Sequence, residues 1–506
     1  MAGSSKIISA LHANWWINLA GLLLSFVTSI VLVRSMPAGL YAEYGAVIAM
    51  IGVATLVFEA GANSGLTRYL ADASRQAARG TFYRRMQLRR WMAGLACALV
   101  LLALGPIYAR STPFAHMAAQ PWLFVLIGAT VVMSLTKLLG HYGLLALFET
   151  RTALMRQQLF MLLRSAALAT IALAGGTLSL LVVALLVIAC IEALIVHRAL
   201  WRIIGTERAP VPPGFVNRAQ VFGLLTVFDK ACAMLGSGTV ILLLLAPRQP
   251  AIVIALLALA IDLVGKVIGL TVMPMGNLVA PYLSHTSDAA EAQATAVGRV
   301  VKLSSLLYSF SIGAGVLLLP WFVPAVYGTT YEGAGRLALL LLLPAAFENW
   351  IRGCCSPALL RNGLSRSLMK INVVQAVATI TTFVLVRRQP VEVVIASVGG
   401  VRAAVASLNL LALRPLVPAG SYWVPFQGAL LGILSCGVAY SWVSALPLPA
   451  AARALLQIAS FAVVFCMGLR WVVFRDRDTL HLAHRIAGGR ARLLSWLLPR
   501  PPLADT

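Results

Sequence analysis

The sequence predicts an all-α, polytopic membrane protein, and its composition and the grouping of its apolar residues both point that way. Of its 506 residues, 60% are hydrophobic and only 11% are charged, and the mean hydropathy is +0.88. A soluble protein of this length needs a polar surface that this composition cannot supply. The apolar residues are also gathered into windows of about 20 residues, the length at which a helix crosses a bilayer.

About fourteen such windows follow one another along the chain, each read as one transmembrane helix. The fifth and sixth are separated only by Gly175, Gly176 and Thr177, and the eleventh is short, so twelve or thirteen helices remain an alternative. The windows are centred in residues 15–33, 44–66, 91–108, 122–148, 159–176, 178–197, 221–246, 251–273, 303–323, 337–358, 371–386, 392–413, 426–446 and 453–474.

The basic residues set the predicted orientation. The net charge is +24, from 40 Lys and Arg against 16 Asp and Glu, and most of the basic residues fall in loops on the same side as the N-terminus. Segment 68–90 alone carries seven arginines and one aspartate. The positive-inside rule therefore predicts both termini in the cytoplasm of a bacterial inner membrane. In that setting the basic charge favours contact with anionic membrane lipids over nucleic acid.

An internal echo predicts duplicated halves. A Tyr-Leu pair followed four residues later by Ser occurs after the second and the eighth window, and a tyrosine follows the third and the ninth. The predicted domains are two six-helix bundles, 1–220 and 221–425, an additional helix pair at 426–475, and a basic cytoplasmic tail at 476–506. The echoing residues are Tyr69, Leu70 and Ser74 with Tyr282, Leu283 and Ser287, and Tyr108 with Tyr327.

Patterns that would mark an enzyme or a metal site are missing from the sequence. No P-loop and no Gly-x-Ser-x-Gly elbow occur, and the seven histidines do not pair with glutamate at zinc spacing. The seven cysteines are scattered through apolar windows and read as small core residues. The longest predicted outer loops, 109–121 and 324–336, are short for an enzyme that must hold an acceptor. We therefore expect no catalytic residues, no metal and no cofactor.

Ionisable residues inside the predicted helices form the candidate site, because such groups are costly in a bilayer unless they are paired or hydrated. Asp262 with Lys266, and Glu348 with Arg352, are spaced to share one helix face. Each pair could be a self-neutralised salt bridge, or several together could line a polar cavity. The other candidates are Asp229, Lys230, Lys137, Glu192, Glu59 near the end of the second helix, and Arg34 at the outer end of the first.

Three stretches resemble one transporter family. Residues 18–47 place Arg34, Pro37 and the run Glu43-Tyr44-Gly45 as they occur at the start of polysaccharide transporters. Residues 58–71, with Glu59, Gly61 and Arg68, and residues 326–344 are similar to later steps of the same family. The chain resembles the O-antigen and exopolysaccharide flippases of the multidrug/oligosaccharidyl-lipid/polysaccharide exporter superfamily. The likeness covers most of residues 10–360, and beyond that only the hydropathy agrees.

This resemblance implies a two-bundle, alternating-access flippase. Its cargo would be an undecaprenyl-diphosphate-linked oligosaccharide, its driving force a proton or sodium gradient, and its partners the polysaccharide polymerase and export machinery. A diphosphate needs cations in a low-dielectric cavity. We assign that role to Lys137, Lys230, Lys266, Arg352 and Arg34, and the role of charge partner or ion-coupling group to Asp229, Asp262, Glu348 and Glu59.

Other functions stay open on the sequence alone. A multidrug-type antiporter of the same superfamily exports cations and would want a net acidic cavity, whereas here basic and acidic groups inside the helices are nearly balanced. A membrane polysaccharide polymerase or ligase is disfavoured by the short outer loops. A scaffold for an envelope-assembly complex would not need ionisable residues in the bilayer.

Overall fold

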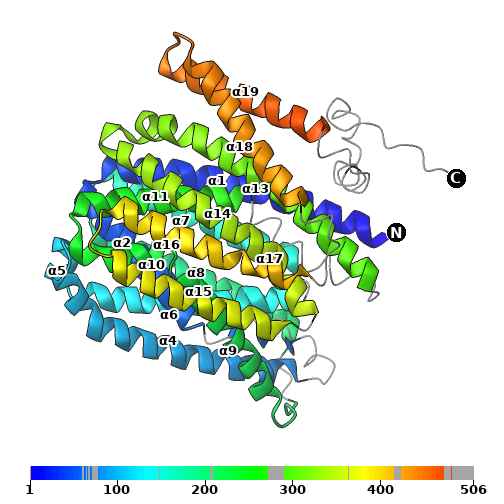
Figure 1. Ribbon diagram of the computed structural model, residues 1–506. Coiled ribbons are helices and arrows are strands. Elements are labelled where there is room, and N and C mark those ends of the chain that lie inside the picture. The colour runs from blue at the N-terminus through cyan, green and yellow to red at the C-terminus, as the bar shows by residue number, and fades with distance from the viewer. Residues whose placement is uncertain are drawn as a thin grey trace. The chain divides into compact units, whose positions relative to one another are not determined.

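The computed structural model (Figure 1) describes residues 2–59, 62–63, 65–66, 69–70, 78–147, 149–205, 209–271, 290–362, 364–414, 423–471 and 480. Every regular element within these ranges is a helix. The all-α, polytopic fold predicted from composition is therefore confirmed. The second members of the sequence echo (residues 282–287), Arg68, and the tail after Trp471 lie outside the described residues, Leu480 excepted.

The chain forms two compact units. The N-terminal unit is Ala13–Leu259, and the C-terminal unit is residues 260–506 together with 1–12. This division falls inside one helix, α11 (Ala251–Thr271), and so comes later in the chain than the boundary at residue 220 that the repeat suggests. The two units are defined by contacts within each of them, whereas the boundary at residue 220 comes from a repeat in the sequence. The predicted domain boundaries therefore stay a prediction.

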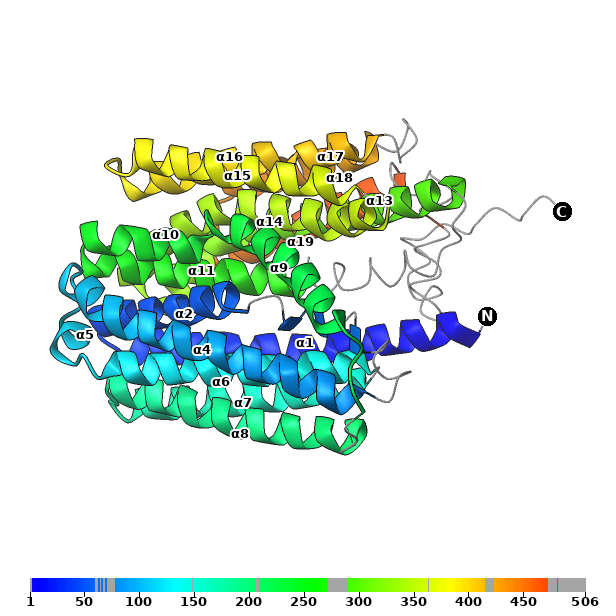
Figure 2. The same cartoon turned by 90° about the horizontal axis from the view of Figure 1, so that it is seen from below.

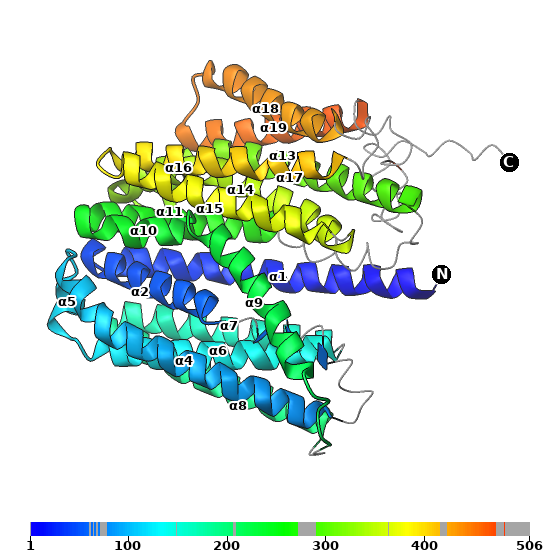
Figure 3. The same cartoon turned by 60° about the horizontal axis from the view of Figure 1, so that its bottom comes forward.

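In the N-terminal unit, long helices run side by side around α6 (Figure 2). Helices α4 and α8 flank α6, α7 packs on α8, and α2 packs on α6 and α10. Helix α9 runs at an angle to α4 (Figure 3). The bounds are α1 (Ala2–Ser35), α2 (Ala38–Val57), α4 (Arg79–Arg110), α5 (Ala115–Ala119), α6 (Leu123–Ala146), α7 (Thr150–Leu173), α8 (Leu178–Ile204), α9 (Phe215–Met234), α10 (Gly238–Leu245) and the 3-10 turn η1 (Ala246–Arg248).

In the C-terminal unit, α14 packs between α13 and α16, α15 packs on α16, and α18 and α19 pack on each other and on α13. The rings of Phe461 and Phe465 stack at 5.6 Å and form a core with Leu317 and Ala439. The bounds are α13 (Ala290–Tyr327), η2 (Thr329–Tyr331), α14 (Glu332–Arg361), α15 (Ser365–Val386), α16 (Val391–Ala406), α17 (Leu408–Ala412), α18 (Trp423–Ser444) and α19 (Ala450–Trp471).

The helices expose apolar faces as a bilayer requires. On α4, Leu95, Leu99 and Ile107 are exposed by 59%, 69% and 65%, while Gly94 and Cys97 on the other face are buried. Exposing such a long face of large apolar side chains to water would be unfavourable, whereas contact with the hydrocarbon of a bilayer carries no such cost. The exposed stripe therefore confirms that lipid is the main solvent of these helices.

The helix count is not settled by the described residues. Ten helices within them are long and apolar enough to cross a membrane, so the count of about fourteen stays a prediction. The seventh window, 221–246, is not one helix, because α9 ends at Met234 and α10 begins at Gly238. The second window extends too far, because α2 ends at Val57 and Glu59 lies in the turn that follows.

Candidate functional site

Helices α6 and α8 bring three ionisable side chains into one cluster. Lys137 and His141 lie one turn apart on α6, and Glu192 lies on α8. Lys137 Nζ donates to Glu192 Oε2 at 2.6 Å, and His141 Nε2 lies 2.9 Å from Glu192 Oε1. The side chain of Glu192 is 5% exposed and that of Lys137 is 17% exposed. A buried carboxylate is thus neutralised by two partners inside the helix bundle, as such a group requires.

One ring nitrogen of His141 has no hydrogen-bond partner among the described residues. Because the Glu192 carboxylate accepts, Nε2 carries the hydrogen and Nδ1 presents its lone pair. This Nδ1 atom is buried, so it is a polar atom of the bundle interior that the described contacts leave unsatisfied.

A second histidine nearby is fixed in its neutral form. His197 Nε2 lies 3.0 Å from the carbonyl oxygen of Thr136, which can only accept, so Nε2 carries the hydrogen. Its Nδ1 then accepts from the Tyr83 hydroxyl at 2.6 Å. Both ring nitrogens are used, and His197 serves to link α4, α6 and α8 rather than to exchange protons.

Glu59 and Lys230 form an ion pair between the turn after α2 and helix α9, with 3.3 Å from Nζ to the carboxylate oxygens. Asp229, which directly precedes Lys230 in the sequence, has no described side chain. The same turn is held by Arg90 of α4, which is 1% exposed. The Arg90 guanidinium donates to Asn63 Oδ1 at 3.0 Å, to the Leu135 carbonyl at 3.1 Å and to the Glu59 carbonyl.

In the C-terminal unit, Asp262 and Lys266 of α11 form a close ion pair. The Lys266 side chain is 4% exposed and that of Asp262 is 36% exposed. The charge of the lysine is neutralised on its own helix face, as the i, i+4 spacing allows. Of the two interpretations that the sequence left open for this pair, the geometry favours the self-neutralised salt bridge.

Glu348 of α14 is the centre of a larger network. Its Oε1 accepts from Arg352 Nε at 2.9 Å and from Gln375 Nε2 at 2.8 Å, and its Oε2 contacts Arg402 at 2.5 Å. Arg352 also donates to Asn372 and Gln375 of α15, both at 2.9 Å. Two guanidinium groups thus share one carboxylate where α14, α15 and α16 pack together.

The residues of the first family-like stretch have structural contacts. Glu43 is 2% exposed, and its carboxylate accepts from the backbone N–H groups of His116 and Met117 at 3.1 and 3.0 Å. It thereby fastens α5 to α2. A Cβ on Gly45 would lie 2.6 Å from the Ala258 methyl carbon, so glycine allows α2 and α11 to approach closely. Arg34 is exposed in the last turn of α1.

The sequence found some of these groups and missed others. It named both i, i+4 pairs because spacing on one helix is enough to predict them. It named Lys137, Glu192, Glu59 and Lys230 without pairing them across helices, and it missed His141, Arg402 and Gln375 as members of a site. Among the described residues, no group of three His, Cys, Asp or Glu side chains is placed to hold a metal ion.

Comparisons with known proteins find a similarity in structure but none in sequence. No family model matches the sequence, and no curated protein matches it. Among solved structures, the lipid II flippase MurJ in an inward closed conformation aligns with a TM-score of 0.73 and 10% identity, over 93% of this chain and 99% of the flippase.

This chain has the fold of that flippase. The MATE transporter VcmN of Vibrio cholerae aligns with a TM-score of 0.58 and 14% identity, over 82% of this chain and 99% of VcmN. The eukaryotic MATE transporter AtDTX14 aligns with a TM-score of 0.54 and 14% identity, over 85% of this chain and 99% of AtDTX14. At these identities the likeness concerns the fold. The protein is a multi-pass membrane protein with a transporter fold, and its structural neighbours are transporters rather than enzymes.

Proposed function

We propose that this protein is a flippase that moves an undecaprenyl-diphosphate-linked oligosaccharide across the bacterial inner membrane for surface polysaccharide synthesis. The observation that carries the proposal is the near-complete structural match to a lipid II flippase, together with the absence of an ATP-binding motif in the sequence. The substrate passes from the cytoplasmic to the periplasmic leaflet by alternating access, and both termini stay in the cytoplasm.

The extent of the match supports a flippase over a MATE-type antiporter. Residues 426–506 make up 81 of the 506 residues, and the flippase match leaves 7% of the chain uncovered. Part of the α18–α19 segment must therefore lie inside that match. The VcmN and AtDTX14 matches leave 18% and 15% of the chain uncovered, more than twice the share that the flippase match leaves.

The charge of the α14–α15–α16 cluster suits a diphosphate. Arg352 and Arg402 both contact the Glu348 carboxylate, so two guanidinium groups lie together in a mostly buried place. An anion that reaches this place would gain charge-assisted hydrogen bonds from these guanidinium groups. Lys137, Lys230 and Lys266 are each held by a carboxylate of their own, and we assign them to later steps in which those pairs open. Arg34, exposed at the end of α1, stays a candidate for the outer mouth.

The driving force is a gradient of protons or sodium ions. The cluster of Lys137, His141 and Glu192 is a buried charged group of the N-terminal unit, and we assign it a part in the coupling. Asp229, Asp262, Glu348 and Glu59 remain the proposed charge partners elsewhere. No cofactor is required for this cycle. The polymerase and the export machinery for the polysaccharide are the proposed partners, with membrane lipids around the helices.

A MATE-type cation antiporter is the second candidate, because two MATE structures share the fold at TM-scores of 0.58 and 0.54. The two functions differ in the charge of the cargo. A cation would be repelled by the Arg352–Arg402 cluster, whereas a diphosphate would be attracted to it.

The test is a complementation experiment in a host that lacks its own copy of the gene. Wild-type protein, Arg352→Met and the exposed loop control Arg388→Met are expressed at equal levels, and surface polysaccharide and lipid-linked intermediates are quantified. We expect Arg352→Met to lower surface polysaccharide at least tenfold while intermediates accumulate, and Arg388→Met to match wild type. Normal polysaccharide without the gene, accompanied by lost resistance to cationic drugs, would favour the antiporter instead.

A further inference from the structure

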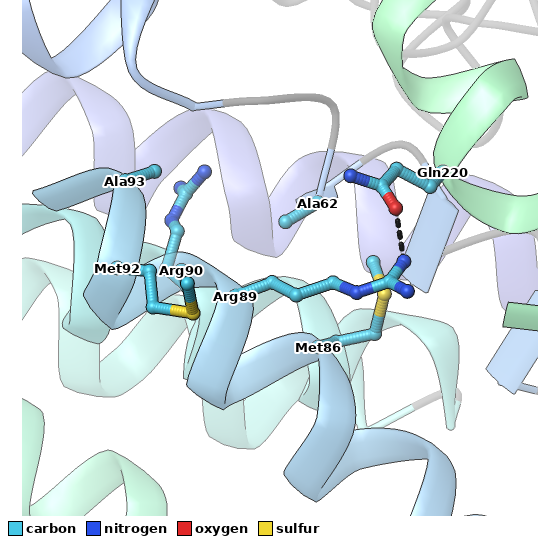
Figure 4. Close-up of a pocket in the computed structure, with 7 residues that line it drawn as sticks. All are labelled: Ala62, Met86, Arg89, Arg90, Met92, Ala93 and Gln220. Carbon is cyan, nitrogen blue, oxygen red and sulfur yellow. Dashed lines mark hydrogen bonds between the residues drawn. The ribbon is translucent and has the colours of Figure 1, made fainter. Parts of the chain in front are cut away.

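The N-terminal unit contains a pocket that the transport cycle does not use. It has a volume of about 370 Å³ and lies between α4 and α9 (Figure 4). That volume falls in the range of about 300–1,000 Å³ typical of small-molecule sites. The lining residues are Ala62, Met86, Arg89, Arg90, Met92, Ala93 and Gln220.

Arg89 is held in position for a ligand rather than for an acid of the protein. Its guanidinium reaches from α4 to α9, where it donates to Gln220 Oε1 and, at 3.3 Å, to Asn217 Oδ1 (Figure 4). Both acceptors are neutral amides, so they fix the orientation of the group without neutralising its charge. A guanidinium has five N–H donors, and these two bonds leave others for a planar oxyanion.

Both charged residues in the described lining of the pocket are arginines. Arg90 lies beside Arg89, is 1% exposed and donates to two carbonyl oxygens and an amide oxygen. The described lining residues include no carboxylate. Glu59, outside that lining, gives its backbone carbonyl to Arg90, and its carboxylate binds Lys230 and also attracts the Arg90 guanidinium. Two guanidinium groups in one pocket without an acidic lining residue favour an anionic ligand.

The residues exposed around the pocket indicate where it lies relative to the bilayer, and this position indicates which kind of anion it binds. On α4, Met92 and Leu88 are exposed by 64% and 60%, and Val221 of α9 is exposed by 59%, which together form a lipid-facing surface. Toward the start of α4, Arg84 and Arg85 are exposed, and the Arg84 guanidinium lies 5.2 Å from the Trp201 ring. The change from a basic, tryptophan-bearing end to an apolar face marks the headgroup region of a bilayer.

We propose that this pocket binds the phosphate of an anionic membrane phospholipid, whose acyl chains lie along the exposed faces of α4 and α9. Arg89 is the residue that contacts the phosphate, and Gln220 positions the Arg89 guanidinium. Arg90, which is buried in the pocket wall, contributes a second positive charge. Basic pockets between transmembrane helices on the cytoplasmic side are suited to such headgroups. Arg89, Arg90 and Gln220 are not among the residues assigned to the transported substrate, so the inference holds for either proposed function. It ties α9 to α4 and thereby makes the protein sensitive to lipid composition.

The test is native mass spectrometry of the full-length protein in mixed micelles that contain phosphatidylglycerol or phosphatidylcholine. We expect wild-type protein to retain phosphatidylglycerol about tenfold more than phosphatidylcholine. Arg89→Met should abolish that preference, and Arg89→Lys should keep part of it because the charge remains. Arg110→Met, an exposed arginine at the opposite end of α4, is the matched control and should behave as wild type. Equal retention by wild type and Arg89→Met would overturn the proposal.

Two further arms separate the sources of the phosphate and guard against a misfolded variant. Gln220→Glu puts a carboxylate against Arg89 without removing an arginine, and it should lower phosphatidylglycerol retention about as much as Arg89→Met. Inorganic phosphate, added to protein in phosphatidylcholine alone, should leave the thermal midpoint unchanged while phosphatidylglycerol raises it. A midpoint raised equally by inorganic phosphate, or displacement of phosphatidylglycerol by undecaprenyl diphosphate at equal concentration, would overturn the assignment to a structural lipid.

Discussion

The ion pair between Lys137 and Glu192 gives the sharpest test of how the N-terminal unit is held together. Glu192→Gln leaves the Lys137 ammonium in a place where its side chain is only 17% exposed, with no carboxylate within reach among the described contacts. Breaking a buried pair by removing one partner costs about 3–5 kcal/mol. Lys137→Met leaves Glu192 hydrogen-bonded to His141, so its cost should be lower, about 1–3 kcal/mol.

The double variant Lys137→Met/Glu192→Gln removes both charges, and we expect it to be more stable than Glu192→Gln alone. The coupling energy in this cycle should be about 1–3 kcal/mol. It is obtained from unfolding by SDS in mixed micelles, with the thermal midpoint as a second readout. Single costs that simply add in the double variant would refute the contact. Transport in the double variant then separates the roles of the pair: restored stability without restored transport places the pair in the transport cycle, whereas restoration of both makes it structural.

The remaining predictions concern three other contacts. Glu348→Gln strips two guanidinium groups of their carboxylate and should lower stability by about 3–5 kcal/mol, more than Arg402→Met does; a smaller effect of Glu348→Gln in thermal unfolding would contradict the network. Gly45→Val should destabilise the protein by about 1–3 kcal/mol because its side chain meets Ala258, while Gly39→Ala, with open space around it, is the control; equal midpoints would argue against the close approach. Glu43→Ala leaves two backbone N–H groups of α5 unpaired, and faster hydrogen exchange confined to residues 115–119 is the expected result.

The helical fold was predictable because hydrophobicity alone dictates where a chain must be helical in lipid. Hydropathy did not predict the interruptions within the helical segments. The interruption between α9 and α10 lies inside an apolar window, and its signal in the sequence is the short run Gly236-Ser237-Gly238. Ser237 accepts from the Val240 N–H at 3.4 Å and begins α10, an N-cap that a window average conceals. Likewise α2 ends at Val57 although the apolar character continues beyond it.

The candidate site was predictable only where one helix carries both partners. Asp262 with Lys266 and Glu348 with Arg352 follow from a spacing of four residues. Glu192 and Arg402 pair across helices with residues far away in the chain, and their registers are set by packing of α6 on α8 and of α14 on α16. Nothing in a single sequence fixes that register. The sequence therefore named several charged residues as candidates, and the structure supplied the contacts that they make across helices.

The measurement that tests the central claim most directly is translocation by the purified protein in liposomes. Fluorescent undecaprenyl-diphosphate-linked oligosaccharide is incorporated in both leaflets, and dithionite added outside reports which molecules cross when a proton or sodium gradient is imposed. The flippase account predicts complete quenching at a rate that rises with the amount of protein, is slowed at least tenfold by Arg352→Met and is unaffected by Arg388→Met. Quenching that stops at the outer leaflet, as in protein-free liposomes, while a cationic dye is exchanged for protons by the same preparation, would contradict it.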